Sequence, residues 1–241
     1  MDAQSFIEAL VRARDARHAQ DHPLVREWAC GRLTRLEVAH VVLQHVRWSQ
    51  EVATLLGVLQ ALAADPAVQH HCVLRLAQWH GLKADVPEEE AHSDWERQMR
   101  FIESCGVRRE EAERIPITAG ARALADYHWS LAFRRPWQVA AAAVWASTSQ
   151  EVGVLRRVLP GLIHYYGYQP GCEAIRFFEE RSLADPVDPA HTLPVLAEHV
   201  LEPVLFTECL EAVKMATGIQ WLFWTELYRW VEAKGAVGRA G

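Results

Sequence analysis

The sequence lacks the features that assign a chain to a membrane or to nucleic acid. No apolar run reaches the roughly 18 to 20 residues that span a bilayer, and no basic segment resembling a signal peptide opens the chain. Positive charge is also not in excess, because 25 basic residues face 31 acidic ones and leave a net charge of −6. We therefore expect a cytoplasmic protein whose partners are neither nucleic acid nor a membrane.

Cysteine is sparse, and the common short catalytic motifs are missing. The five cysteines, at positions 30, 72, 105, 172 and 209, form no CxxC pair. An odd number at such distances predicts buried free thiols rather than a disulfide framework or a zinc site. The sequence also has no Gly-rich phosphate loop, no GxSxG and no HExxH. Local motifs therefore give no sign of nucleotide binding or of nucleophilic hydrolysis.

Alternating strand patterns are almost absent, whereas helix-start signals recur along the chain. Thr34 and Glu37 form a capping box before an apolar run to about residue 63, and Asp65 precedes a proline that opens a segment to about residue 81. Ser5 is expected to cap a first helix ending near residue 20. We predict one all-α domain over residues 1–241. Further helical segments are expected at residues 23–31, 86–106, 118–133, 136–158, 171–184 and 192 to the tail.

Arginines within apolar stretches are the first candidates for a binding site. Arg75 lies in VLRLAQW, Arg157 in VLRRVLP, and Arg181 follows IRFFEE. A buried guanidinium requires an anionic partner, so three that converge would suit a ligand carrying several carboxylates. The alternative is that each pairs with a protein acid or reaches solvent past its apolar stem. On the last helix, Trp221 and Trp224 share a stripe that predicts either an aromatic wall or ordinary core.

Histidine is abundant, with 12 residues in the chain, and this suggests a metal hypothesis. Helical carboxylate centres use acid and histidine pairs at i, i+3, and Asp188 with His191 is the nearest match. His92 could supply a ligand from a second helix. The alternatives are that Asp188 is a helix cap before a proline and that His92 is hydrogen-bonded in the core.

Three stretches carry a family resemblance over roughly residues 6 to 230. They are DHPLVREWACGRLTRLEV, RPWQVAAAAVW and LPGLIHYYGYQ. The chain resembles the heme-oxygenase-like helical superfamily, and within it pyrroloquinoline quinone synthase and its relatives, the PqqC-like and TenA-like proteins. The resemblance implies a seven-helix bundle, usually dimeric, around one internal pocket. In the synthase, that pocket binds a polycarboxylate precursor and uses molecular oxygen without a metal.

The resemblance also suggests roles for individual positions. Arg75, Arg157 and Arg181 correspond to basic pocket residues of the synthase, and His18 corresponds to a pocket histidine. Four positions depart from the family. Histidines are expected at Trp79 and Val154, a tyrosine at Phe177 and an arginine at His45.

Two sister groups of the superfamily imply other chemistries. In the diiron oxygenases, His92, Asp188 and His191 would match three iron ligands, but the other ligand positions correspond to Trp79, Ser147 and Ala184. A complete diiron centre is therefore not expected. The thiamine-degrading group would have a cysteine near Ser147, which this sequence lacks.

Three functional hypotheses follow. The first is a cofactor-independent oxidoreductase that acts on a small, planar, anionic substrate with molecular oxygen. Arginine and histidine side chains in an internal pocket would hold the substrate and transfer protons. The second makes iron the cofactor, and the third is a non-catalytic fold that binds a ligand or a partner; a homodimer is expected in each. The residues assigned are His18, His22 and His92 for proton transfer, Arg75, Arg157, Arg181, Trp221 and Trp224 for substrate, and His92, Asp188 and His191 for metal.

Overall fold

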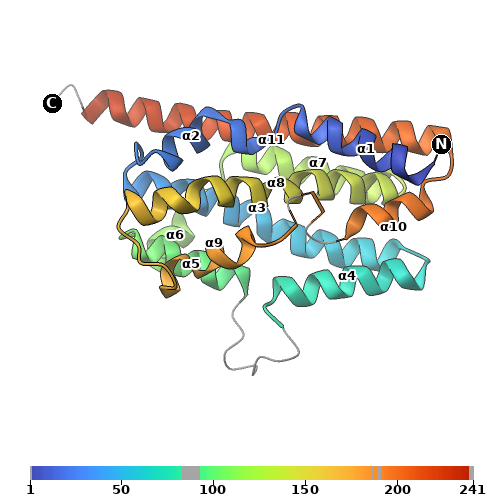
Figure 1. Ribbon diagram of the computed structural model, residues 1–241, viewed down its shortest axis with the longest axis horizontal. Helices are drawn as coiled ribbons and strands as arrows, with labels where there is room; N and C mark the ends of the chain where they lie inside the picture. The colour runs from blue at the N-terminus through green and yellow to red at the C-terminus, as the bar shows by residue number, and fades with distance from the viewer. Residues whose placement is uncertain (1, 83–92, 186, 189–190, 239–241) are drawn as a thin grey trace.

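Helices form the whole regular structure of the residues described by the computed structural model, which are 2–82, 93–185, 187–188 and 191–238 (Figure 1). No strand occurs among them, so the all-α prediction is confirmed. The α-helices are α1 (Ala3–Asp15), α2 (Pro23–Ala29), α3 (Arg35–Leu62), α4 (Pro66–Trp79), α5 (Asp94–Ser104), α6 (Arg109–Arg114), α7 (Ala119–Arg134), α8 (Trp137–His164), α9 (Arg176–Ser182), α10 (Thr192–His199) and α11 (Pro203–Gly238). Two 3₁₀ turns, η1 (Ala19–Asp21) and η3 (Glu173–Ile175), precede α2 and α9.

Capping chemistry sets the starts of α3 and α4 as the sequence predicts. The Thr34 hydroxyl accepts the Glu37 backbone N–H, and the Glu37 carboxylate accepts the Thr34 backbone N–H, which completes the capping box of α3. Asp65 caps α4 with Pro66 at its first position. The first helix differs from the prediction, because Asp2 is its N-cap and accepts the backbone N–H of Ser5.

Proline has different effects on the later helices. α8 continues through Pro160 to His164, whereas the sequence pattern predicts an end near residue 158. The segment expected as one helix from residue 192 is two helices, because the chain leaves helical geometry at residues 200–202 before Pro203 starts α11. The 171–184 segment contains a 3₁₀ turn and the short α9. The start expected at residue 86 lies outside the described residues, and α5 begins at Asp94 behind a Ser93 cap.

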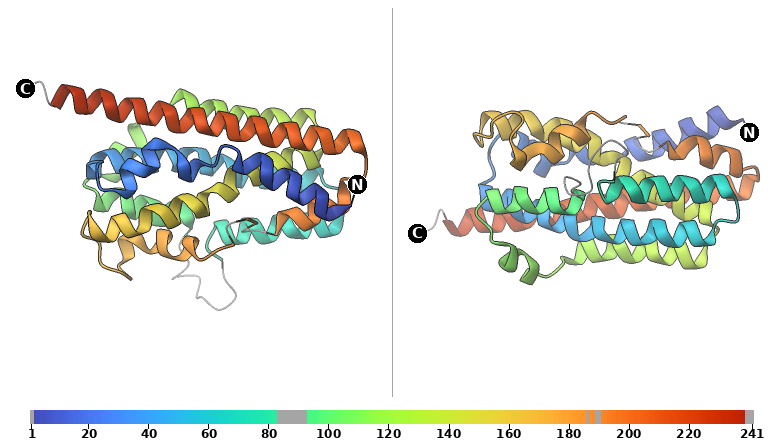
Figure 2. Two further views of the ribbon diagram at one scale, coloured as in Figure 1. Left: turned by 45° about the horizontal axis from the view of Figure 1, so that its top comes forward. Right: turned by 90° about the horizontal axis from the view of Figure 1, so that it is seen from below.

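Two helices of 28 residues each, α3 and α8, form the centre of the bundle. α8 packs against α11, α2, α9 and α7, while α3 packs against α4, α5 and α7. α11 runs along the full length of the molecule beside α1 and α2, and its C-terminal end projects beyond the other helices (Figures 1 and 2). This packing leaves an internal space between α3, α4, α8, α9 and α11, which is where the candidate site lies.

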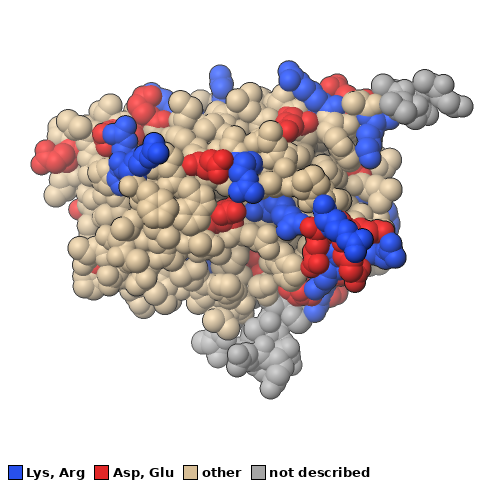
Figure 3. Space-filling model, turned by 180° about the vertical axis from the view of Figure 1, so that it is seen from behind, with Lys and Arg blue, Asp and Glu red and all other residues tan. Residues whose placement is uncertain are grey.

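The described surface carries charges of both signs in close pairs. Seen from behind, acidic and basic side chains gather together at one end, and much of the remaining face carries neither (Figure 3). Ion pairs such as Arg109 with Glu96 and Arg97 with Glu180 neutralise the α5 region. No described helix is long and apolar enough to cross a membrane.

Candidate active site

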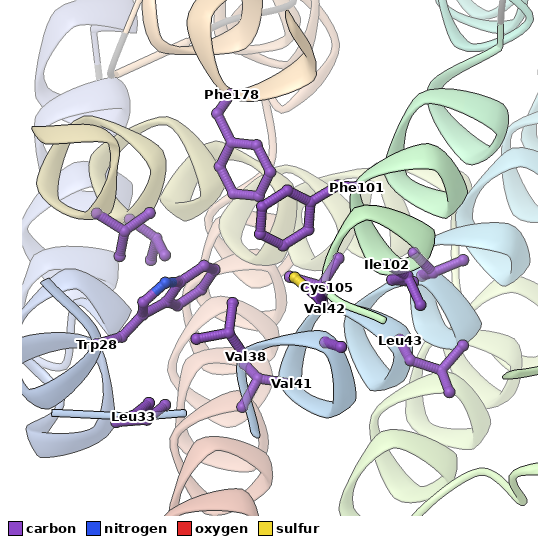
Figure 4. Close-up of a cluster of buried hydrophobic side chains, with 14 of the residues drawn as sticks. Trp28, Leu33, Val38, Val41, Val42, Leu43, Phe101, Ile102, Cys105 and Phe178 are labelled. Atoms are coloured by element: carbon purple, nitrogen blue, oxygen red, sulfur yellow. The ribbon is translucent and has the colours of Figure 1, made fainter. Parts of the chain in front are cut away.

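An apolar chamber lies between α2, α3, α8, α9 and α11. Aromatic side chains from three of these helices form much of its wall, and the Trp28 and Phe178 rings meet edge to face at 6.0 Å (Figure 4). The volume between its lining residues, including the part open to solvent, is about 430 Å³. We call this space the apolar chamber; its lining residues are Ala19, Trp28, Val41, Val42, His45, Gln98, Gln150, Glu151, Val154, Leu155, Phe177, Phe178, Gln220 and Trp224.

A second, more polar space adjoins the apolar chamber between α3, α4 and α8. It contains two guanidinium groups and measures about 600 Å³ out to the surface. We call it the arginine hollow; its lining residues are His45, Trp48, Ser49, Arg75, Gln78, Trp79, Thr148, Glu151, Val152, Arg181 and Ala184. His45 and Glu151 line both spaces, so the two are neighbours that share part of their walls, one apolar and one charged.

A histidine and a glutamate meet at the junction of the two spaces. His45 Nε2 lies 3.8 Å from Glu151 Oε1, and its Nδ1 lies 3.4 Å from Gln98 Oε1. The Gln98 amide nitrogen donates to the Asp94 carbonyl, so the Gln98 oxygen faces the imidazole and accepts from Nδ1–H. In the tautomer that donates from Nδ1, Nε2 is the ring nitrogen that can accept a proton, and it faces Glu151.

Arg75 is the cation of the arginine hollow that has no direct partner among the described residues, although the carboxylates of Asp188 and Glu151 favour its charge. No hydrogen bond or ion pair joins its guanidinium to any other described residue. Burial lowers its pKa, to about 10, and the neighbouring Arg181 acts in the same direction. The group remains charged at neutral pH, and a buried charge without a partner is unfavourable. Arg75 therefore provides a strong binding position for an anion.

Arg181 differs from Arg75 because it already has a partner. Its guanidinium donates to the carboxylate of Asp94, which reaches it from α5. Burial opposes the charge of Arg181, but the carboxylates of Asp94 and Glu151 outweigh burial and raise its pKa. Burial raises the pKa of Asp94, and the adjoining guanidinium opposes that rise. The pair positions Arg181 in the hollow without adding net charge.

Comparison with known proteins agrees with this architecture. The TENA/THI-4/PQQC family profile matches residues 9–229. The chain belongs to the TENA/THI-4/PQQC family. Its fold is similar to that of a TenA homolog from Pseudomonas syringae pv. tomato, with a TM-score of 0.73, 13% identity and coverage of 94% of this chain and 92% of the other.

Two further solved structures share the fold. A domain with a heme oxygenase-like fold from Shewanella denitrificans matches with a TM-score of 0.73, 11% identity and coverage of 96% and 94%. A CADD-like protein from Nostoc punctiforme matches with a TM-score of 0.71, 15% identity and coverage of 93% and 98%. Among curated proteins, none matches the chain. The expected heme-oxygenase-like bundle is confirmed at the level of fold.

The three arginines singled out from the TENA/THI-4/PQQC resemblance do not converge on one point. Arg75 and Arg181 both line the arginine hollow. Arg157 lies on the outer face of α8, where its side chain is 42% exposed and its guanidinium is 3.5 Å from the Asp21 carboxylate. The described lining of the two spaces therefore contains two of the three arginines, and only Arg75 lacks a protein partner.

His18 and His22 are buried beside the apolar chamber but are not among its lining residues. His18 caps η1 by accepting the Gln20 backbone N–H. His22 caps α2 through Nδ1, while its Nε2 lies 3.1 Å from the Thr225 hydroxyl. Burial lowers the pKa of His22 to about 4, so its ring is neutral at pH 7. The geometry of both residues is that of helix caps, and His92 lies outside the described residues.

The two tryptophans of the α11 stripe occupy different environments. Trp224 is buried and lines the apolar chamber, as an aromatic wall requires. Trp221 packs edge to face on the His22 ring at 4.6 Å and is not part of the chamber lining. Trp224 therefore forms part of the chamber wall, whereas Trp221 packs against the cap of α2.

Asp188 and His191, two of the three residues proposed for iron, are not arranged as metal ligands, and the third, His92, lies outside the described residues. Both carboxylate oxygens of Asp188 accept backbone N–H groups of the first turn of α10, from Thr192 and Leu193 at 2.8 Å each. His191 is exposed and has a left-handed backbone, with φ of 52°. No cluster of three or more His, Cys, Asp or Glu side chains suited to a metal occurs in the described part of the chain. Asp188 acts as the helix cap that was the alternative interpretation.

The positions that depart from the family pattern mostly face the site. Trp79 and Ala184 line the arginine hollow, and Val154 and Phe177 line the apolar chamber. Ser147 is buried with its hydroxyl 3.2 Å from His128 Nε2 and lines neither space. Apart from Ser147, these positions therefore lie in the walls of the two spaces.

Sequence reasoning missed the junction residues, although one signal was available. Glu151 is the only charged residue between Pro136 and Leu155, and a lone acid in a long uncharged helical run indicates a functional or paired carboxylate. His45 was considered only as a replacement for a family arginine. Gln98 carried no sequence signal, because its role depends on a contact with a helix 53 residues earlier in the chain.

Proposed function

We propose that this protein is an oxidoreductase that binds a small, anionic substrate with a flat ring and oxidises it with molecular oxygen. The observation that carries the proposal is the guanidinium of Arg75, which has no direct partner among the described residues and lies in a hollow beside an aromatic-lined chamber. A carboxylate on Arg75 gains charge-assisted hydrogen bonds, and a ring in the chamber gains apolar contact with Phe177, Phe178 and Trp224.

The junction supplies the proton chemistry that an oxidation requires. A two-electron oxidation of a dihydroxy ring removes two electrons and two protons from the substrate and gives both to oxygen, which becomes hydrogen peroxide. His45 Nε2, unprotonated and held by Gln98, accepts the first proton, and Glu151 at 3.8 Å stabilises the imidazolium that forms. The apolar lining excludes water from the reacting ring.

The lining of the two spaces favours this chemistry over hydrolysis through a thiol. Neither space has a cysteine among its described lining residues. Cys72 is buried on α4, and its burial raises its pKa, which disfavours the reactive thiolate.

The test uses 3-(3,4-dihydroxyphenyl)propanoate, which has a flat oxidisable ring and one carboxylate. Oxygen uptake and peroxide formation are measured with the parent protein, with Arg75→Gln and with Arg157→Gln as the matched control. We expect Arg75→Gln to raise KM or Kd about tenfold or more through loss of a charge-assisted contact. Arg157→Gln changes neither, because that side chain pairs with Asp21 outside the site.

Two results would contradict the proposal in different ways. Equal affinity for the parent and for Arg75→Gln would remove the anion site. Binding that depends on Arg75 without any oxygen uptake would instead favour a non-catalytic ligand-binding protein. A circular dichroism melt of both variants shows whether a loss of affinity reflects loss of fold.

A further inference from the structure

The arginine hollow presents one unpaired cation and one carboxylate side by side. Arg75 has no hydrogen bond or ion pair with a described residue, and the Glu151 carboxylate has only the His45 ring, at 3.8 Å, within ion-pair distance among them. Arg75 and Glu151 do not form an ion pair with each other, although both line the hollow. Two opposite charges that face one space without meeting leave a position for a ligand between them.

The charges of the hollow limit the ligand further. Arg181 is matched by Asp94, so the remaining charges are those of Arg75 and Glu151. A ligand with a carboxylate alone pairs with Arg75 but brings a second negative charge toward Glu151. A ligand with an amine alone pairs with Glu151 but brings a second positive charge toward Arg75. A ligand that carries both groups gives each buried charge a partner.

The apolar chamber determines the rest of the ligand. It lies next to the hollow, with which it shares His45 and Glu151, and its wall includes Trp28, Phe178 and Trp224. A short apolar or aromatic side chain attached to the charged end would extend into it. The charged end and the ring would then lie on opposite sides of the junction.

We propose that the substrate is a zwitterion of the α-amino acid type, with its carboxylate on Arg75, its ammonium on Glu151 and an aromatic side chain in the apolar chamber. This inference rests on the proposed function, since it uses the same anion position. It adds a second recognition group, and it assigns to Glu151 the selection of substrates that carry an amine.

Three matched probes separate the contributions of the two charges. L-Phenylalanine carries both groups, 3-phenylpropanoate carries the carboxylate alone, and 2-phenylethylamine carries the amine alone. Isothermal titration calorimetry on the intact protein measures binding without turnover. We expect L-phenylalanine to bind about tenfold or more tightly than either of the others, since each lost contact is charge-assisted.

Variants assign each contact to its residue. Glu151→Gln should weaken L-phenylalanine about tenfold and leave 3-phenylpropanoate unchanged or tighter, because a repulsive charge is removed. Arg75→Gln should weaken both carboxylates about tenfold and spare 2-phenylethylamine. Glu211→Gln is the matched control, because Glu211 is exposed on α11 and pairs with Lys214.

The outcomes distinguish this inference from the proposed function. Equal binding of L-phenylalanine and 3-phenylpropanoate overturns the zwitterion assignment, and so does an unchanged Kd for L-phenylalanine in Glu151→Gln. If binding still weakens in Arg75→Gln, the anion site of the proposed function stands. Failure of all three probes to bind the parent also overturns it, and the oxygen-uptake test above then decides the proposed function separately.

Discussion

At the scale of single residues, sequence reasoning reached the site only in part. Arg75 and Trp224 could be selected because a charged residue or a large aromatic residue within an apolar helical segment is recognisable from the sequence alone. The pairing of Arg181 with Asp94 could not, since the two side chains are 87 residues apart and meet only when α9 packs near α5. The cap role of Asp188 was visible in the Asp-Pro dipeptide. It competed with a metal interpretation that only three-dimensional contacts could decide.

His22 gives the chain a stability that depends on pH. Its folded pKa of about 4 lies below the ordinary value of 6.5, because burial disfavours the charged ring. Above pH 6.5 both folded and unfolded states hold a neutral ring, and the stability is fully present. As the pH falls from 6.5 toward 4, the unfolded chain takes up the proton first, so stability is lost. Between pH 7 and pH 5 we expect His22 to account for a loss of about 2 kcal/mol.

Chemical denaturation of the parent and of His22→Asn at the two pH values measures this contribution. Asparagine keeps a cap acceptor for the Leu24 N–H but does not titrate. The variant should therefore lose less stability between pH 7 and pH 5 than the parent does. An identical loss in both proteins would show that other buried histidines, such as His128, cause the whole effect.

At the scale of elements, helix starts were more predictable than helix ends. The starts of α3 and α4 depend on side chains within four residues of each other, so the sequence contains all the information. Pro160 shows why the ends differ. Its helix continues because α8 packs against α2 and α11, and this tertiary packing outweighs the loss of one backbone hydrogen bond.

The crossing of α8 and α2 depends on a glycine. A Cβ placed on Gly161 would lie 2.4 Å from the Ala29 carbonyl oxygen, whereas one placed on Gly57 of α3 would meet nothing within 4 Å. We expect Gly161→Ala to lower the free energy of unfolding by about 1 to 3 kcal/mol through overpacking. Gly57→Ala should raise it by about 0.5 to 1 kcal/mol through helix propensity.

Urea titrations of the two alanine variants check this pair of opposite effects. Each variant adds the same atoms near the C-terminal end of a long helix, so the difference between them reports the contact with Ala29. If both substitutions stabilise the protein to the same extent, the α2 and α8 backbones are not in close contact at this crossing.

At the scale of the whole molecule, the fold class followed from helical periodicity and caps, and the family from three short stretches of sequence. The site chemistry did not follow, because it depends on residues from seven helices that converge only in the bundle. The homodimer stays a prediction. Light scattering during size-exclusion chromatography should give twice the 27.3 kDa of one chain, and a mass equal to one chain would exclude it.

The solitary guanidinium of Arg75 has a consequence for the empty protein. Folding buries this cation without a direct partner among the described residues, so the ligand-free state has less than its attainable stability. A bound molecule that neutralises the guanidinium removes this unfavourable contribution in addition to making its own contacts. The melting temperature therefore rises with occupancy of the site. The thermal shift produced by members of a metabolite collection therefore ranks them by their fit to this cation, before any reaction has been assayed.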